Sequence, residues 1–299
     1  MEYRCSDCPR SCGAKRTALS GSGFCRAPVL PHIIRAAAHF GEEPCISGTR
    51  GAGTVFFTGC SLHCVYCQNR QISFGCGGRP FGVEDLRTLF LRMQDTGVHN
   101  IELVTPTHFT RILAEALSGL KLEVPVVWNS SGYEKPETLR MLDGLVQVYL
   151  PDLKYLSPSA AARYSAAPDY PEAAKAAIDE MFRQRGPYRL REDGILESGV
   201  LIRHLILPGN LEESRDVIDY VADRFPKGSV LFSLMSQYTP VAALPRYPEL
   251  GRTVTADEND ALIHYLSVRG LTDGYWQEPD SSGTGSIPAF DGTGLDILP

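Results

Sequence analysis

The stretch GTVFFTGCSLHCVYC, residues 53–67, joins an apolar run to a loop rich in cysteine. Its first part, residues 53–59, is β-branched and aromatic, which is typical of a buried strand. Cys60, Cys64 and Cys67 follow directly, separated by three and by two residues. Three thiolates this close can bind three irons of a cubane cluster and leave the fourth iron without a protein ligand. The stretch therefore predicts an open metal centre, because a catalytic metal needs a free coordination position.

The rest of the chain alternates between further apolar runs and amphipathic stretches. Strands are expected at residues 100–105, 124–128, 145–150, 199–207 and 229–235. Helices are expected within residues 86–93, 112–117, 136–142, 171–186, 217–225 and 257–266, with Asp257 as the cap of the last one. Such strand–helix repeats predict an α/β fold in which helices cover a sheet of parallel strands. Both a doubly wound sheet and a partial (β/α)6 TIM-like barrel fit these repeats.

Three regions are expected along the chain. Residues 1–50 are rich in Cys, Gly and Pro and predict a small Cys-rich N-terminal module. Residues 51–279 carry the strand–helix repeats, and the Gly/Ser-rich residues 280–299 predict a flexible C-terminal tail. In a parallel barrel the chemistry takes place at the carboxyl ends of the strands, so functional side chains are expected there.

The composition argues against several classes of protein. The chain has 299 residues, of which 43% are hydrophobic and 21% charged, as in an ordinary globular protein with one large domain. A net charge of −6 without a block dense in Lys and Arg argues against a broad nucleic-acid surface. No apolar run approaches the ~20 residues of a membrane span, and the N-terminus does not resemble a secretory signal. A cytoplasmic protein without a membrane partner is expected.

The chain has nine cysteines, all of them within its first 76 residues. Four early ones are spaced so that they can form a closed all-cysteine shell: Cys5, Cys8, Cys12 and Cys25. In a reducing cytosol such cysteines bind metal more often than they form disulfides, so a second metal, zinc or iron–sulfur, is expected. Cys45 and Cys76 stand alone and are expected to be buried thiols. Glu42 and Glu43 are expected to form a solvated acidic pair.

The cysteine triplet has one structural alternative. Cys60, Cys64 and Cys67 could form a zinc knuckle with His63 or Cys76 as the fourth ligand. Structural zinc sites usually use paired ligand doublets, and a triplet that opens a strand–helix repeat fits this pattern poorly. The iron–sulfur cluster is therefore the favoured prediction.

The triplet resembles the hallmark motif of the radical S-adenosylmethionine (SAM) superfamily, in which an aromatic residue, here Tyr66, precedes the last cysteine. The resemblance implies a 4Fe–4S cluster whose open iron binds the amino and carboxylate groups of SAM. It also implies reductive cleavage of SAM to methionine and a 5′-deoxyadenosyl radical, which abstracts a hydrogen atom. It favours the partial barrel over the doubly wound sheet.

Over roughly residues 50–240 the chain resembles the pyruvate formate-lyase activating enzymes, and in particular an activase-like branch. The strings VVWNSSGY, VYLPDLKYL and VLIRHLILPGN, which begin at residues 126, 148 and 200, carry this likeness. The resemblance implies an oxidoreductase that takes hydrogen from a backbone glycine of a glycyl radical enzyme. An electron donor such as flavodoxin or ferredoxin is implied as a further partner.

Polar residues at the expected strand ends form the predicted SAM site. At the second strand most family members carry Gly-Gly-Glu, whereas this chain has Thr105-Pro106-Thr107. In the activases the lysine that matches Lys154 reaches the SAM carboxylate. The predicted set is Tyr66, Thr105, Thr107, Asn129, Ser131, Asp152, Lys154 and Arg203. No residue is assigned a catalytic role from the sequence.

Two alternatives to the activase remain open. The chain fits a radical SAM enzyme that acts on a small molecule or on another peptide, and it also fits a non-catalytic metal-binding protein. A glycyl partner needs an open groove that admits a peptide loop, whereas a metabolite needs a closed pocket. No local motif identifies the substrate.

Overall fold

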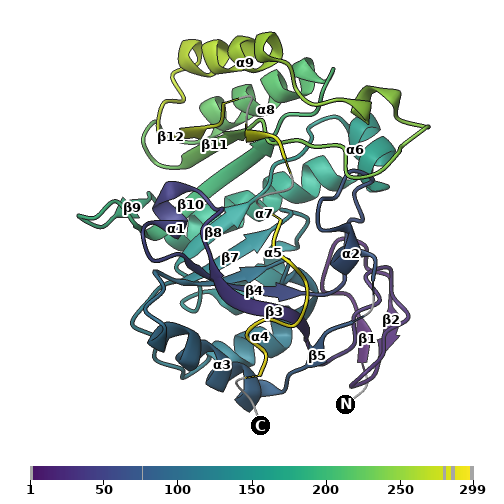
Figure 1. The fold of residues 1–299 in the computed structure, drawn as a ribbon, viewed down its shortest axis with the longest axis vertical. Coiled ribbons are helices and arrows are strands. Elements are labelled where there is room, and N and C mark those ends of the chain that lie inside the picture. Colours follow the sequence, from purple (N-terminus) through teal and green to yellow (C-terminus); the bar gives the residue numbers. More distant parts are fainter. Residues whose placement is uncertain (1–2, 76, 279–280, 284–286, 297–299) are drawn as a thin grey trace.

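A central sheet of mostly parallel strands, with helices packed around it, organises the chain (Figure 1). The computed structural model describes residues 3–75, 77–278, 281–283 and 287–296, so the expected buried thiol of Cys76 lies outside the described residues. In spatial order the strands are β12 (Gly274–Trp276), β11 (Leu231–Met235), β10 (Leu196–Leu205), β8 (Val148–Pro151), β7 (Val126–Ser130), β6 (Ile101–Val104), β4 (Ala52–Phe57), β3 (His32–His39) and β5 (Arg79–Pro80). The α/β fold of the sequence prediction is confirmed.

All six predicted strands are present, and each pairs in parallel with its predicted neighbours, from β4 through to β11. Every residue of β4, β6, β7, β8 and β11 is buried. Burial on both faces explains why these strands read as unbroken apolar runs. The sequence did not predict β12, which extends the parallel set, or β3, which pairs antiparallel with β4. The short β9 (Arg189–Leu190) pairs antiparallel with β10.

The predicted helices are also present. They are α3 (Val83–Asp95), α4 (Thr110–Leu117), α5 (Pro136–Leu139) with a 3-10 turn at Arg140–Leu142, α7 (Tyr170–Arg185), α8 (Leu211–Arg224) and α9 (Ala256–Val268). Three further helices were not predicted: α1 (Pro44–Ser47), α2 (Arg70–Ser73) and α6 (Pro158–Ser165). The predicted cap at Asp257 is wrong. Thr255 caps α9, because its hydroxyl accepts the Glu258 amide while the Glu258 side chain bonds back to the Thr255 amide.

The N-terminal segment forms a two-stranded hairpin, β1 (Tyr3–Cys5) and β2 (Ala14–Arg16), at one side of the barrel (Figure 1). After this hairpin the chain continues to residues 32–39, which form β3 of the central sheet. Both cysteine-bearing segments therefore lie next to the first parallel strand, β4, because β3 pairs with β4 and the triplet loop follows β4 directly.

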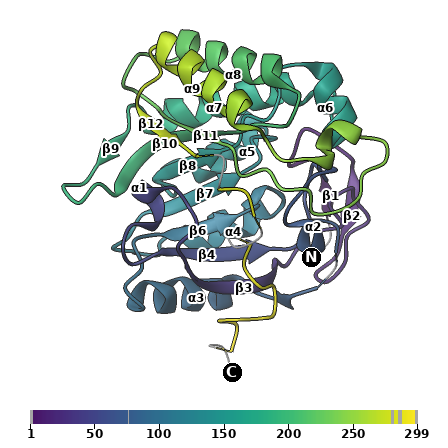
Figure 2. The same ribbon diagram turned by 45° about the horizontal axis from the view of Figure 1, so that its top comes forward.

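The last described residues run along β3. The Gly292 amide donates to the Ile34 carbonyl at 3.1 Å, and the Ala36 amide donates to the Thr293 carbonyl at 3.0 Å. The Phe290 ring packs edge-on against Phe56 at 5.4 Å. Figures 1 and 2 show this yellow segment crossing in front of the sheet toward β3.

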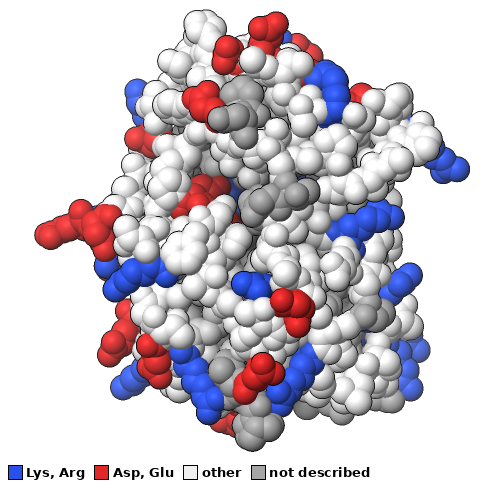
Figure 3. Space-filling view, in the orientation of Figure 1, with Lys and Arg blue, Asp and Glu red and all other residues white. Residues whose placement is uncertain are grey.

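The surface carries both signs of charge. On the face shown in Figure 3, Lys and Arg side chains are scattered among Asp and Glu side chains. Among the helices that the structure describes, none combines the length and the apolar character that crossing a membrane requires.

Candidate cluster and ligand site

The cysteine triplet lies on the loop that follows β4, at the carboxyl end of the parallel strands. Cys60, Cys64 and Cys67 line one cavity of about 180 Å³. Gly59 opens the loop with a φ of +86°, and a Cβ there would lie 2.5 Å from the Cys25 carbonyl oxygen. Glycine is required at this position both by the left-handed backbone and by this close approach. The loop therefore begins in direct contact with the N-terminal segment.

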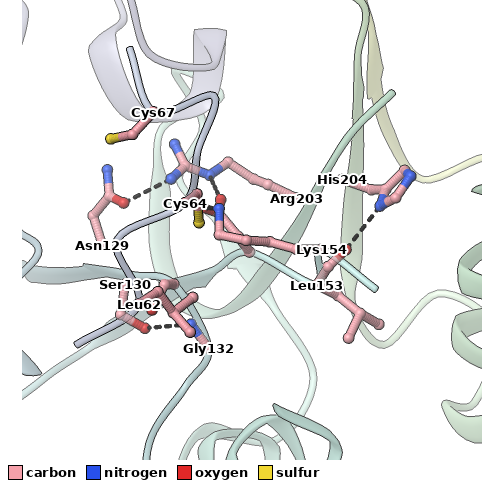
Figure 4. Close-up of polar contacts among 12 residues, drawn as sticks. Leu62, Cys64, Cys67, Asn129, Ser130, Gly132, Leu153, Lys154, Arg203 and His204 are labelled. Carbon is pink, nitrogen blue, oxygen red and sulfur yellow. Dashed lines mark hydrogen bonds and ion pairs between the residues drawn. The ribbon is translucent and has the colours of Figure 1, made fainter. Parts of the chain in front are cut away.

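A hydrogen-bonded network of charged side chains lines the same cavity, and Figure 4 shows Arg203 and Lys154 of this network beside Cys64. The Arg203 guanidinium donates to Asn129 Oδ1 at 2.6 Å, to Asp152 Oδ1 at 3.0 Å and to Glu42 Oε2 at 3.0 Å. Lys154 Nζ donates to the second Asp152 oxygen at 2.6 Å. These residues come from the ends of β7, β8 and β10 and from the segment after β3. The fold thus gathers two cations and two carboxylates beside the cysteine loop.

Burial and mutual pairing set the ionisation of this network. Burial raises the pKa of Asp152, but Lys154 and Arg203 outweigh it and hold that pKa below its usual range. Burial lowers the pKa of Lys154, and Asp152 outweighs it in turn, so the ammonium is retained. Burial also raises the pKa of Glu42 to about 7, against the opposing effect of Arg203. The cavity therefore offers fixed cations to an anionic group of a ligand.

Most predicted site residues line this cavity. Besides the three cysteines they are Tyr66, Thr105, Asn129, Ser131, Asp152, Lys154 and Arg203. Thr105 has a φ of +59°, which is rare for a non-glycine residue and marks a constrained backbone at the end of β6. Thr107 is the one residue of the predicted SAM site that does not line this cavity. It is buried in a 3-10 turn (Thr107–Phe109), and its hydroxyl donates to Glu134 Oε1 at 3.0 Å.

Tyr66 links the loop to the residues behind it. Its hydroxyl accepts a hydrogen bond from the Tyr155 hydroxyl at 2.6 Å, and both side chains are buried. His204, the neighbour of Arg203 in β10, is an ordinary core residue. His204 contacts the Leu153 carbonyl at 2.8 Å and the Ser214 hydroxyl at 2.9 Å, which satisfies both ring nitrogens (Figure 4). Burial lowers the pKa of His204 to about 4, so the ring is neutral.

Sequence reasoning missed several parts of the site, and two of them bear on its chemistry and access. Glu42 was expected to be solvated, and this expectation is wrong, because its side chain is only 13% exposed and pairs with Arg203. Glu42 lies far in sequence from the charged residues that it contacts, and it follows the antiparallel strand β3. The second part is Ile287 and Pro288, apolar residues of the C-terminal segment that line the cavity. A Gly/Ser-rich context gave no signal that these residues face a site.

The donor set of the triplet suits an iron–sulfur cluster. Soft thiolate ligands favour iron–sulfur over hard cations, and a cubane takes one thiolate at each of three irons. Burial raises the pKa of the Cys67 thiol to about 12 and also raises the pKa of Cys60. Free thiols here are therefore protonated at neutral pH, and a bound cluster displaces their protons. Together with Lys154 and Arg203 at the same cavity, the residues present fit a cluster with a charged ligand beside it.

The early cysteines form a second group. Cys5, Cys8 and Cys25 are buried and Cys12 is exposed, and Arg16 donates to the Cys25 sulfur at 3.3 Å. Within the described part of the chain, no three His, Cys, Asp or Glu side chains, those of the triplet included, are arranged around a single metal ion. The predicted second metal therefore stays a prediction.

A parallel sheet with three cysteines at its carboxyl edge, facing a cavity of paired charges, defines a protein that can hold a metal cluster and a polar ligand side by side. The model of the family described as the radical SAM superfamily matches residues 54–221. The chain belongs to the radical SAM superfamily, and this membership implies a 4Fe–4S cluster and SAM.

Comparison with individual proteins finds one similar sequence and several similar structures. The chain is 27% identical over 277 residues to the uncharacterized protein MJ0674 of Methanocaldococcus jannaschii, covering 89% of this chain and 75% of that protein. SuiB of Streptococcus suis, solved with its precursor peptide SuiA, superimposes with a TM-score of 0.50 at 14% identity, over 73% of this chain. The match spans only 46% of the SuiB chain. Methylornithine synthase (PylB) gives a TM-score of 0.45 at 11% identity, over 80% of this chain and 77% of that chain.

Proposed function

We propose that this protein cleaves SAM reductively and uses the 5′-deoxyadenosyl radical to take a hydrogen atom from a small molecule. One observation carries the proposal: the cysteine triplet and the paired charges of Lys154, Asp152 and Arg203 line the same cavity. A bound cluster would supply the electron that divides SAM into methionine and the radical, and transfer of one hydrogen atom would give 5′-deoxyadenosine and a substrate radical.

The side chains of the cavity bind and orient SAM. Lys154 holds the SAM carboxylate, and Asp152 keeps the ammonium in place through its 2.6 Å hydrogen bond. Arg203 fixes Asp152 and Asn129, so that the end of β7 presents Asn129 and Ser131 to the polar parts of the nucleoside. The constrained backbone at Thr105 takes the place of Gly-Gly-Glu near the amino group. Thr107 is not assigned this role, because its hydroxyl is bonded to Glu134.

The C-terminal segment favours a small substrate. Ile287 and Pro288 line the cavity, and the residues after them are bonded to β3. A glycyl radical enzyme would have to insert a peptide loop past this segment, and a peptide substrate such as the one solved with SuiB meets the same obstacle. Activation of a glycyl radical enzyme is therefore the second candidate, supported by the DLK string at residues 152–154. In both cases a flavodoxin or ferredoxin supplies the electron and the reaction takes place in the cytoplasm.

The test measures SAM binding and 5′-deoxyadenosine formation in the anaerobically reconstituted protein with dithionite. We expect Lys154→Ala to weaken SAM binding roughly ten- to a hundredfold, because a hydrogen bond to a charged group contributes about 1.5–3 kcal/mol. Its iron content should match that of the wild type. Lys175→Ala, on the outer side of α7, is the matched control.

Two results contradict the proposal. If the Cys60/Cys64/Cys67 triple alanine variant retains all the iron of the wild type, the cluster is not at the triplet. If the reconstituted wild type neither binds SAM nor forms 5′-deoxyadenosine, the chain acts as a non-catalytic metal-binding protein.

We also propose that Cys5, Cys8, Cys12 and Cys25 bind a second metal. Their spacing and the Arg16 hydrogen bond to the Cys25 sulfur support this proposal. Elemental analysis of the triple alanine variant is the test, since it removes the iron of the triplet. Zinc or iron near one site per chain is expected, and the absence of both would identify these four cysteines as free thiols.

A further inference from the structure

Arg10, in the N-terminal segment, bridges two segments that are far apart in sequence. Its Nε donates to the Ser61 carbonyl at 2.7 Å, and its Nη2 donates to the Leu62 carbonyl at 3.4 Å. The same side chain donates to the Ser165 carbonyl at 3.1 Å and to the Ala166 carbonyl at 2.8 Å. One guanidinium thus holds two carbonyls of the cysteine loop and two at the end of α6.

Both of these segments determine where Cys64 lies. Ser61 and Leu62 are loop residues between Cys60 and Cys64. Ser165, at the other end of the bridge, donates its hydroxyl to the Cys64 sulfur at 3.0 Å. A planar guanidinium with five fixed donors suits this arrangement, whereas a lysine offers a single point charge. Arg10 therefore reaches the cluster site without touching a cysteine of the triplet.

A second contact from the N-terminal segment reaches the same loop. The Phe24 ring stacks on His63 at 4.5 Å, and the Arg10 guanidinium lies 3.8 Å from the centre of the Phe24 ring. His63 directly precedes Cys64 and has a φ of +58°, a conformation that a non-glycine residue keeps only when its surroundings hold it. Phe74 stacks on the opposite face of His63 at 4.4 Å. The strained part of the loop is thus clamped between two aromatic rings.

The N-terminal segment is itself bonded to the barrel. Arg111 donates to Asp7 Oδ1 at 2.9 Å, and Thr138 donates to the Asp7 carbonyl at 2.8 Å. Lys135 donates to the Ser11 hydroxyl at 2.7 Å. These bonds lie on both sides of Arg10 in the sequence and reach α4, α5 and the loop that precedes α5. They anchor the stretch from which Arg10 extends toward the cysteine loop.

We propose that Arg10 is a positioning residue that presets the loop of Cys60, Cys64 and Cys67 for cluster binding. The N-terminal segment is then a part of the cluster site, because Arg10 belongs to it. The inference rests on the proposed function, because it assumes that the triplet holds the cluster. Its physical basis is that charge-assisted hydrogen bonds to four carbonyls tie the cysteine loop to the end of α6 and so restrict its motion.

The experiment compares Arg10→Met, Arg10→Lys and the wild type, with Arg4→Met as the control. Arg4 lies on the exposed side of the same hairpin. Hydrogen exchange of the iron-free proteins is measured over residues 60–67 and, as a reference, over β6 to β8. The reconstituted proteins are then compared by iron loss to a chelator and by the reduction potential of the cluster.

For Arg10→Met we expect exchange at residues 60–67 to rise by roughly tenfold or more, with β6 to β8 unchanged. Iron loss to the chelator should quicken, and the reduction potential should fall, because a cation that favours the reduced cluster is gone. Arg10→Lys keeps the charge, so its potential should stay near that of the wild type while its loop still exchanges fast. Arg4→Met should behave as the wild type.

Unchanged exchange at residues 60–67 in Arg10→Met overturns the role of Arg10. An equal rise across β6 to β8 also overturns it, since Arg10 would then support the whole barrel instead of the loop. If the wild type takes up no iron at the triplet, the proposed function fails, and the iron analysis shows this separately from the exchange data.

Discussion

Arg203 shows how single side chains keep charge inside the barrel. Its side chain is 12% exposed, and its guanidinium contacts two carboxylates and an amide oxygen. Burying such a charge without partners would cost several kcal/mol. Removing one partner therefore leaves part of the buried charge of Arg203 without compensation. The network around Arg203 is therefore expected to respond to pH as a unit, and Glu42 is the more easily protonated of the two carboxylates that contact Arg203.

Replacing Glu42 by Gln should change the pH dependence of stability in the iron-free protein. The pKa of Glu42 is raised from 4.5 to about 7, so between these values the folded state binds a proton that the unfolded state has released. Stability therefore falls as pH rises through this window, by up to about 3 kcal/mol for this group. Glu42→Gln lacks this contribution, so the stability of the wild type relative to the variant should decrease from pH 4.5 to pH 7.

Urea unfolding at a series of pH values measures this difference. Glu172→Gln, at an exposed position of α7, is the matched control. A stability difference between the wild type and Glu42→Gln that stays constant over the window would show that Glu42 is ionised throughout, held by Arg203.

At this scale the sequence predicted the residues that follow buried strands. Asn129, Asp152, Lys154 and Arg203 could be placed because the ends of parallel strands meet at one edge of the sheet. Glu42 could not be placed, since it enters the barrel from an antiparallel strand whose pairing no local pattern reveals. Thr107 follows a strand but begins a 3-10 turn, which directs its hydroxyl to the buried Glu134.

At the scale of elements, burial decided what could be predicted. The core strands are apolar along their whole length, and the long helices repeat apolar residues on one face. By contrast, β12 has three residues, and β3 is only partly buried. The eight residues of α6 include a run of alanines, so no apolar face stands out from the rest of the helix. Ser157 caps the start of this helix, and its last residue is Ser165, which contacts Cys64. Such elements are stabilised by tertiary contacts more than by their own pattern.

The cap of α9 gives a test at this scale. Thr255→Ala removes the side chain that accepts the Glu258 amide, and it should lower the free energy of unfolding by about 1 kcal/mol. Asp257→Ala changes only a first-turn charge near the helix dipole and should cost less, about 0.3–1 kcal/mol at low salt. Urea unfolding of both variants checks the order. A larger loss for Asp257→Ala would restore Asp257 as the principal cap.

At the scale of the whole molecule, the C-terminal segment attaches to the sheet without a strand pattern. Gly292 and Thr293 are bonded to β3 through their backbones, which carry no side-chain periodicity, and Phe290 contacts Phe56 of β4. The prediction of a tail at residues 280–299 followed from Gly and Ser content alone. The glycines have a further use here, because they allow the backbone of this segment to approach β3 closely.

Gly294 is the position where this attachment is most sensitive. Its φ is +77°, and a Cβ there would lie 1.7 Å from the Ala36 carbonyl oxygen, so Gly294→Ala cannot keep the present contact. We expect the variant to lose hydrogen-exchange protection at Gly292 and Leu295 while the parallel strands stay protected. Ile287 and Pro288 should then shield the cavity less.

Access to the cavity can be measured by alkylation of Cys60 and Cys67 in the iron-free protein, with each cysteine followed by peptide mass spectrometry. Gly294→Ala should raise the alkylation rates of these two thiols several-fold and leave that of the exposed Cys12 unchanged. Gly251→Ala, at a position where a Cβ meets no neighbour within 4 Å, is the control. Equal rates in Gly294→Ala and the wild type would mean that the C-terminal segment does not restrict entry. In that case the preference for a small substrate would lose its support, and the glycyl radical enzyme would become the favoured partner.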